Sequence, residues 1–273
     1  MYKYLILQRL SVKGVNAQPA WWLVGAPGPV TYLGFAQDLA IKLDLEDKNP
    51  AVAIVMHDWS LRAEDVDWVI RPHQFRAAAL INNDDYASGS RTLAGQPTVR
   101  GDMVVTVIVR IPEEQPIDLR EVERILDTGR LAGGSITSHA FSAKGPFLQP
   151  TLEQVRRYVR SGFTLVDRED LMAAAPGKDP LDRFLAATKP PLKDARLRKE
   201  ESEDRTSWLT GYAAGWLQLT QPEQRPGARE GLPHCFVEQL VGLGQFVSLR
   251  EKPPQFWSLQ RKNSQVVIAQ PID

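Results

Sequence analysis

The strongest secondary-structure signal in this sequence is the run Met103–Val109, in which every residue after the methionine is β-branched. β-Branched side chains are stiff about χ1 and pack well on a pleated surface, so this run favours an extended strand. The chain must therefore build a sheet around this strand. The elements on either side of it decide which kind of sheet.

The first 140 residues alternate between strand and helix patterns. The predicted elements are, in order, a strand at Tyr4–Val12, a helix at Thr31–Leu43, a strand at 51–56, an excursion at 62–100, the strand Met103–Val109, a helix at Pro116–Leu126 and a strand after Gly129. Asp118 is placed to cap the second helix. This is the βαββαβ order of an α+β, ferredoxin-like or RRM-like sheet, a fold often used to bind RNA.

The excursion at 62–100 is far longer than an ordinary hairpin loop, and such insertions are commonly functional. Arginines can clamp phosphates, aromatic rings can stack on bases, and amides can read base edges. The candidate RNA contacts within it are Arg71, Phe75, Arg76, Asn82, Arg91 and Arg100. Its five basic residues are balanced by five acidic ones, so a solvated loop or a protein-docking arm is an equal alternative.

The second half, 151–273, is less regular and is expected to complete a body formed mainly by 1–150. The pattern predicts helices at Leu152–Arg160 and Cys235–Val241, with Gly242–Gly244 closing the latter. Two short helical pieces and several closing strands are also expected. The stretch 188–205 combines prolines with a dense run of charges and is predicted to be a linker.

Composition limits the classes of function. The chain has 33 basic and 33 acidic residues, so its zero net charge argues against RNA binding by bulk electrostatic attraction. Cys235 is the sole cysteine, which excludes an intrachain disulfide and a cysteine zinc site. The sequence has no apolar run long enough for a membrane span and no secretory pattern at its start, so a cytoplasmic protein is expected.

A search for catalytic motifs predicts no enzyme. The P-loop, G-x-G-x-x-G, H-E-x-x-H and G-x-S-x-G patterns do not occur, and no two histidines have metal-ligand spacing. We therefore expect no metal and no cofactor. His57 and His139 could each act as a general base on a ribose hydroxyl, but a hydrogen-bonded structural histidine is the more common case.

Two short segments offer further RNA contacts. Asn16, Gln18 and Trp22 follow the first strand and are candidates to bind RNA. The pair Trp21-Trp22 could instead contact a partner protein, and anchoring of at least one of the two in the core is the more common case. Leu131–Ile136 places two glycines where a backbone could approach a phosphate, with Ser135 as donor and His139 nearby. An ordinary helix-to-strand turn is the alternative for this segment.

Taken together, several motifs resemble one family. They are Leu5–Val12 with Asn16-Ala17, Gly25-Ala26-Pro27 leading to Gly34-Phe35, Arg130–Ile136, Gly162–Val166 followed by Arg168-Glu169, and Phe236-Val237-Glu238 running into Gly242–Phe246. In this order they resemble the second Csy protein family, the Cas-five-type RAMP subunit of type I-F CRISPR complexes. The resemblance is colinear over nearly the whole chain.

The resemblance implies a prokaryotic, cytoplasmic protein with a ferredoxin-like RAMP body and a β-hairpin thumb. It also implies that the chain binds the 5′ handle of the CRISPR RNA (crRNA), caps a backbone of Cas-seven-type subunits and contacts the large Csy subunit where one is present. Target DNA would be engaged indirectly, because guide pairing reads the sequence.

Three alternatives stay open beside this reading. The chain could be a metal-independent endoribonuclease that processes crRNA, with His57 or His139 as base. It could be a structural adaptor that does not touch RNA. The chain is also shorter than the family pattern around 187–210, and in a compact variant it could contact the PAM duplex itself.

Overall fold

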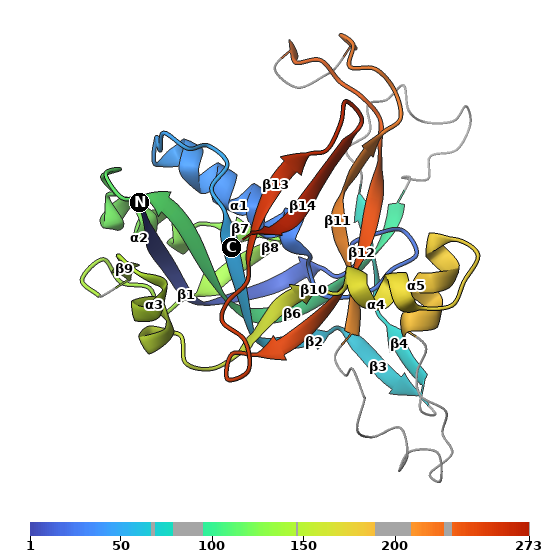
Figure 1. The fold of residues 1–273 in the computed structure, drawn as a ribbon, viewed down its shortest axis with the longest axis horizontal. Helices are drawn as coiled ribbons and strands as arrows, with labels where there is room; N and C mark the ends of the chain where they lie inside the picture. Colours follow the sequence, from blue (N-terminus) through green and yellow to red (C-terminus); the bar gives the residue numbers. More distant parts are fainter. Residues whose placement is uncertain (67–68, 79–94, 146, 189–208, 227–230, 273) are drawn as a thin grey trace.

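The computed structural model describes residues 1–66, 69–78, 95–145, 147–188, 209–226 and 231–272 (Figure 1). The strands are β1 (Tyr2–Asn16), β2 (Val52–Leu61), β3 (Ala63–Val66), β4 (Val69–Pro72), β5 (Gln74–Ala78), β6 (Gly95–Pro112), β7 (Arg130–Leu131), β8 (Gly134–Ser138), β9 (Leu148–Gln149), β10 (Phe163–Asp167), β11 (Leu209–Gln218), β12 (Val237–Ser248), β13 (Phe256–Arg261) and β14 (Val266–Ile272). The helices are α1 (Pro29–Lys42), α2 (Leu119–Asp127), α3 (Leu152–Tyr158), α4 (Glu169–Ala174) and α5 (Pro180–Thr188). The prediction of an α+β fold is confirmed.

Four antiparallel strands form the centre of the sheet, in the order β2-β6-β1-β8. The β-branched run lies within β6, which pairs with β1 on one side and with β2 on the other. Helix α1 connects β1 to β2, and α2 lies between β6 and β8 in the chain. The predicted alternation of strands and helices over the first 140 residues is therefore confirmed.

The helix boundaries follow local chemistry. Helix α1 begins at Pro29, whose missing N–H costs nothing in a first turn. The carboxylate of Asp118 accepts from the backbone N–H groups of Arg120 (2.9 Å) and Glu121 (3.3 Å), so the predicted cap is confirmed. The helix begins at Leu119, three residues later than predicted, because it starts directly after this cap.

The two faces of the central sheet have different surroundings. Leu5, Leu7 and Val107 belong to the main core that α1 and α2 cover. On the opposite face Ile6 and Ile108 belong to a smaller cluster with residues of α3 and β13. Beyond the β-bulge that separates Leu7 from Leu10, this second face loses its apolar cover and becomes polar.

The C-terminal strands extend the same sheet. Strand β13 pairs with β2 through Trp257 opposite Val52, and β10 pairs with β2 through Phe163 opposite Met56. The twelve-stranded sheet thus contains strands from both halves of the chain. Among the described residues, no helix is both long and apolar enough to cross a bilayer.

The predicted helix at Cys235–Val241 is wrong, because Val237–Ser248 forms the strand β12. The glycines Gly242 and Gly244, predicted to close that helix, lie inside this strand. A Cβ atom on Gly242 would lie 2.7 Å from the Tyr212 ring, and one on Gly244 would lie 3.0 Å from it. The glycines therefore make room for an aromatic ring on the paired strand β11.

The excursion contains two strand pairings. Strands β3 and β4 pair with each other, and β5 pairs with the start of β6. Most of the predicted linker at 188–205, together with the candidates Asn82 and Arg91, lies outside the described residues.

Candidate nucleic-acid interface

The polar face of the central sheet carries a group of basic side chains. Leu10 and Val12 of β1 point into the core, so the alternate residues Arg9, Ser11 and Lys13 lie on the opposite face. In β6, Asp102 lies opposite Lys13, and Arg100 lies opposite Asn16. We call Arg9, Lys13, Arg62 and Arg100 the cationic face.

Asp102 organises this face. Its carboxylate accepts from Arg62 Nη2 and from the backbone N–H of Gly14, both at 2.8 Å, and lies 3.6 Å from Lys13 Nζ. Partial burial on its own would raise the pKa of Asp102, but the hydrogen bonds from Arg62 and Gly14 and the charges of Arg62 and Lys13 lower it overall. Asp102 therefore stays ionised at neutral pH and offsets part of the positive charge.

Arg9 and Arg100 have other partners. Arg100 donates from Nη1 to the backbone carbonyl of Gly14 at 2.8 Å. Arg9 has a φ of 50°, rare for a residue with a side chain, and its backbone N–H donates to Thr106 Oγ1 at 3.1 Å. Within the described part of the chain the guanidinium of Arg9 has no ion pair, so it is available to an anion.

His57 lies beneath this face. Its Nε2 is 2.7 Å from Thr106 Oγ1, and burial, followed by the nearby charge of Arg9, lowers the pKa of His57 to about 4. The ring is therefore neutral at physiological pH. Gly162 packs closely against His57, and Gln8 of β1 donates from Nε2 to the carbonyl of Tyr158, the last residue of α3, at 3.4 Å.

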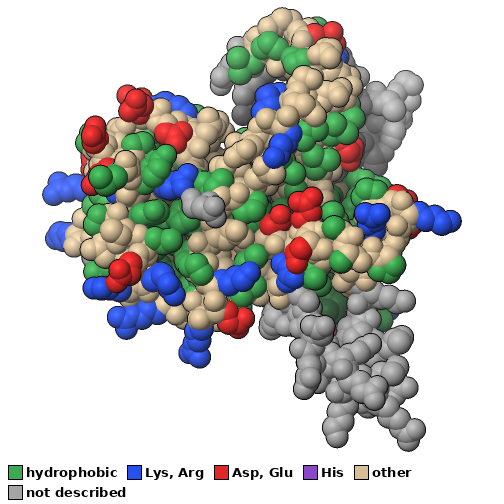
Figure 2. Space-filling view, viewed as in Figure 1, with side chains coloured by type: hydrophobic (Ala, Val, Ile, Leu, Met, Phe, Trp, Pro, Cys, Tyr) green, Lys and Arg blue, Asp and Glu red, His purple; other side chains and the backbone are tan. Residues whose placement is uncertain are grey.

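The α3 region extends the positive charge. Arg156, Arg157 and Arg160 are exposed, although Arg157 pairs with Glu153. Figure 2 shows Lys and Arg side chains gathered along the edge of the molecule that carries α3 in Figure 1. A chain with zero net charge thus still offers local positive surface.

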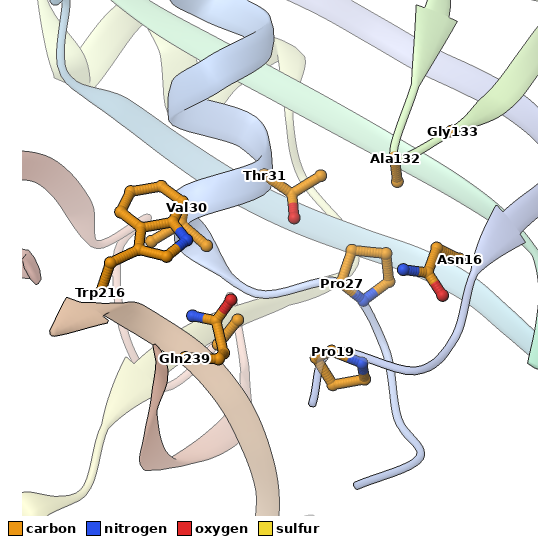
Figure 3. A pocket seen from close by; sticks show the side chains of 10 residues that line it. Asn16, Pro19, Pro27, Val30, Thr31, Ala132, Gly133, Trp216 and Gln239 are labelled. Carbon is orange, nitrogen blue, oxygen red and sulfur yellow. The ribbon is translucent and has the colours of Figure 1, made fainter. Parts of the chain in front are cut away.

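A cavity of about 400 Å³ lies at the end of β1, on the helix-covered side of the sheet (Figure 3). We call it the neutral hollow, because none of its lining residues is charged. Its lining residues are Asn16, Pro19, Pro27, Val30, Thr31, Ala132, Gly133, Ala213, Trp216 and Gln239. Both halves of the chain contribute, since Trp216 and Gln239 come from β11 and β12.

The polar groups of the hollow are held in defined positions. Gln239 lies directly opposite Trp216 in the β11–β12 pairing, and its Nε2 donates to the backbone carbonyl of Gly215. Asn16 Oδ1 accepts from the backbone N–H of Gln18 at 3.0 Å. Figure 3 shows the hydroxyl of Thr31 and the amide oxygen of Gln239 directed toward the middle of the hollow.

The glycine segment forms the tight turn between β7 and β8. Ala132 and Gly133 have φ values of 54° and 76°, as expected for a two-residue hairpin turn with both central residues left-handed. A Cβ atom on Gly134 would lie 2.6 Å from the backbone oxygen of Lys13, so this glycine lets β8 approach β1. Both glycines are thus explained by structure, although Gly133 also lines the hollow.

The candidates after the first strand separate into two groups. Asn16 lines the hollow. Gln18 is hydrogen-bonded to Asn16 through its backbone N–H, and its Nε2 donates to the Trp21 carbonyl at 2.9 Å. Trp22 instead packs edge-on against Phe184 of α5, with ring centroids 5.6 Å apart, and keeps 39% of its surface exposed. It lies outside the lining of the hollow.

The remaining candidates are spread out. Ser135 is exposed on β8 and is paired with Lys13 of the cationic face. The candidate Arg100 belongs to the same face. The side chain of His139 is only 10% exposed, with Nε2 2.9 Å from Asp127 Oδ1 and Nδ1 3.2 Å from the Phe141 carbonyl. Arg71 is exposed on β4. Phe75 and Arg76 lie in β5, paired with Thr98 and Pro97.

Sequence reasoning missed Arg9, Lys13 and Arg62 on the cationic face, and Thr31, Trp216 and Gln239 in the hollow. The alternation within β1 carried a usable signal, because Arg9, Ser11 and Lys13 interleave with apolar residues. The hollow carried no such signal, since it depends on pairing between distant strands. Among the described residues, no group of three or more His, Cys, Asp or Glu side chains is suited to hold a metal.

Comparisons with known proteins agree with one another. The family model described as "CRISPR-associated protein (Cas_Csy2)" matches residues 5–265. The CRISPR-associated protein Csy2 of Pseudomonas aeruginosa (strain UCBPP-PA14) is 26% identical over 288 aligned positions, which cover 89% of this chain and 86% of that relative.

Proposed function

This chain belongs to the Csy2 family of type I-F CRISPR complex subunits, and on that premise we propose that it holds the 5′ handle of the crRNA and caps the backbone filament of a Csy surveillance complex. Its partners would be a Cas-seven-type backbone subunit and, where present, the large Csy subunit. It would act in the bacterial cytoplasm and engage target DNA only through the guide.

The strand order supports the finer fold assignment that this function needs. The antiparallel order β2-β6-β1-β8, with α1 and α2 as crossovers, is that expected of a ferredoxin-like RAMP body. The β3–β4 hairpin and the β5–β6 pairing lie where the thumb is predicted. We propose that they belong to that thumb.

The observation that carries the proposal is that two different surfaces meet at the end of β1. Asn16 lines the neutral hollow, and the residue paired with it in β6 is Arg100 of the cationic face. Basic side chains bind the phosphates of an RNA whatever its base sequence, whereas neutral polar and aromatic side chains contact the bases. An extended RNA needs both kinds of surface side by side.

The test is a salt titration of handle RNA binding, with the protein alone and with its partner subunits. For single-stranded RNA, each lost phosphate contact reduces the slope of log K against log salt by about 0.7. We expect the double variant Arg9→Gln, Lys13→Gln to reduce the slope by about 1.4 on this scale. The matched control is Lys42→Gln, which removes an exposed charge that pairs with Asp38 on α1.

A scrambled RNA of equal length completes the titration. If wild type binds handle and scrambled RNA equally in both settings, the handle proposal is wrong. Crosslinking within the assembled complex then distinguishes a pure adaptor, which would link to protein subunits only. Links to the PAM duplex would favour the compact-variant reading.

We also propose that the chain is not itself a nuclease. A general base works best with a pKa near the operating pH, and the pKa of His57 is about 4. Both ring nitrogens of His139 lie within hydrogen-bonding distance of acceptors in the fold. Incubating repeat RNA with wild type, His57→Ala and His139→Ala tests this, because cleavage lost in either variant would reverse the proposal.

A further inference from the structure

We propose that the neutral hollow binds one unstacked base of the bound RNA, stacked on Trp216 and recognised at its edge by Gln239 and Thr31. This inference rests on the proposed handle binding, because it assigns a place to one nucleotide of that RNA. It adds a base-specific site to a subunit whose other candidate RNA contacts are mainly basic.

The lining of the hollow indicates the chemical class of its ligand. No charged side chain lines it, so a phosphate would find no cation there. Its walls are an indole ring, two prolines and small apolar side chains, and its polar groups are neutral amides and a hydroxyl. A nucleobase has a flat apolar face and an edge of donors and acceptors, which matches this lining. The volume of about 400 Å³ is also sufficient for one base.

The hydrogen-bonding groups are arranged for recognition. The Nε2 of Gln239 is held by the carbonyl of Gly215, and a further contact to the Leu240 carbonyl lies at 3.3 Å. Its amide oxygen has no partner within the described residues and is directed into the hollow, where it can accept from a base N–H (Figure 3). The Thr31 hydroxyl can donate or accept from the opposite side.

The position of the hollow favours RNA over a side chain of a partner protein. The pairing of Asn16 with Arg100 places its rim beside the cationic face. A strand whose phosphates lie along that face can turn one base around the end of β1 into the hollow. Base and backbone would then be held by separate surfaces, as is common in single-strand recognition.

The test uses the complex assembled with its partner subunits and a set of crRNAs, each with an abasic site at one handle position. Base–aromatic stacking accounts for about 5- to 150-fold in affinity per base. We expect one abasic position to lower wild-type affinity by about tenfold. Trp216→Ala should lower the affinity for intact crRNA by a similar factor and should cause no further loss at that position.

The controls separate stacking from general damage. Trp216→Phe should retain part of the affinity because it keeps a ring. Tyr2→Ala removes another exposed ring at the far end of β1 and should behave as wild type. Should Trp216→Ala fail to assemble, 2-aminopurine placed at each handle position in the wild-type complex gives an independent answer, since stacking quenches its fluorescence at one position.

The outcomes are distinguishable. Handle-dependent binding with no position coupled to Trp216, and no quenched 2-aminopurine, overturns the hollow proposal and leaves the handle function intact. No handle-dependent binding by wild type overturns both. If Trp216→Ala weakens assembly with the partner subunits whether or not crRNA is present, and no 2-aminopurine position is quenched in the wild-type complex, the hollow receives a protein side chain and the proposal is wrong.

Discussion

The cationic face and the neutral hollow lie next to each other but are built differently. The face belongs to β1, β6 and the residue after β2, and its charges are partly held by Asp102. The hollow draws its walls from both halves of the chain and contains no charge. This difference predicts that variants of the face alter the salt dependence of RNA binding. Variants of the hollow should instead alter its dependence on base identity.

The two regions also depend on different parts of the core. The face needs only the central strands, whereas the hollow needs β11 and β12 in place. Strand β13 links these C-terminal strands to β2, and Trp257 on β13 is 0% exposed and packs against Tyr212 of β11 at 5.6 Å. A variant that loosens this link should therefore separate the two regions.

The largest effect is expected from Trp257→Ala. Removing a buried tryptophan leaves a cavity and should lower the free energy of unfolding by about 3–5 kcal/mol in urea titrations. Trp257→Phe should cost less, because the buried indole N–H has no hydrogen-bond partner within the described chain and its loss removes a desolvated donor. Hydrogen exchange should show faster opening of β11 and β12 than of β1 and β6. If hydrogen exchange became faster by the same factor in all four strands, the two regions would not depend on different parts of the core.

Gly134→Ala should have the next largest effect. The added Cβ would lie 2.6 Å from the Lys13 backbone oxygen and 2.9 Å from the Val15 nitrogen, so β8 must move away from β1. Overpacking of this kind costs about 1–3 kcal/mol. Because β8 borders both regions, salt dependence and base preference should both change.

Gly133→Ala is the matched control for this variant. Its Cβ would meet nothing within 4 Å, and only its φ of 76° opposes the change. The expected cost is about 1–2 kcal/mol from the left-handed backbone, with β8 still in place. If the two variants lose equal stability and change the salt dependence of binding equally, close packing of β8 on β1 is not what matters.

The sequence predicted the centre of this fold well and its C-terminal half less well, for a physical reason. The run Met103–Val109 carries a local signal because its β-branched residues favour a strand. Helix α2 carries one because its buried residues Val122, Ile125 and Leu126 repeat at helical spacing. In β12 many residues are half-buried on both faces, so the period-two pattern is lost. Val237, Leu240 and Val241 then happen to repeat at helical spacing, which explains the wrong prediction at Cys235–Val241.

The candidate sites follow the same rule. Asn16 was found because it follows a recognisable strand, and it does line the hollow. Trp216 and Gln239 were missed because only the register of β11 on β12 places one opposite the other. That register depends on contacts far apart in the sequence, which no local pattern reports.

A smaller effect is expected from pH, through His57 beneath the cationic face. Its folded pKa of about 4 is below the unfolded value, so the unfolded chain binds more protons between about pH 6.5 and 4. Stability should therefore be full above pH 6.5 and fall as the pH drops toward 4. After allowance for the partly exposed ring, the loss is about 1 kcal/mol.

Unfolding titrations of wild type and His57→Gln across this pH range measure the effect. The variant should have a flatter pH dependence, since glutamine does not titrate. His139→Gln is the control for the loss of an imidazole elsewhere. A wild-type profile that is already flat would mean that His57 is as solvated as in the unfolded chain.

The smallest effect is expected from Asp102→Asn, which is also the sharpest test of whether the cationic face and the neutral hollow act separately. The change removes the counter-charge of Lys13 and Arg62 while keeping a group that can accept from the Gly14 N–H. Each freed cation that reaches a phosphate should steepen the salt slope by about 0.7, which is about twofold in affinity over a threefold change in salt. Gln239→Ala should leave this slope unchanged and should reduce binding only for RNAs that carry the base held in the hollow. A change of slope in Gln239→Ala, or of base preference in Asp102→Asn, would show that the two surfaces act as one site.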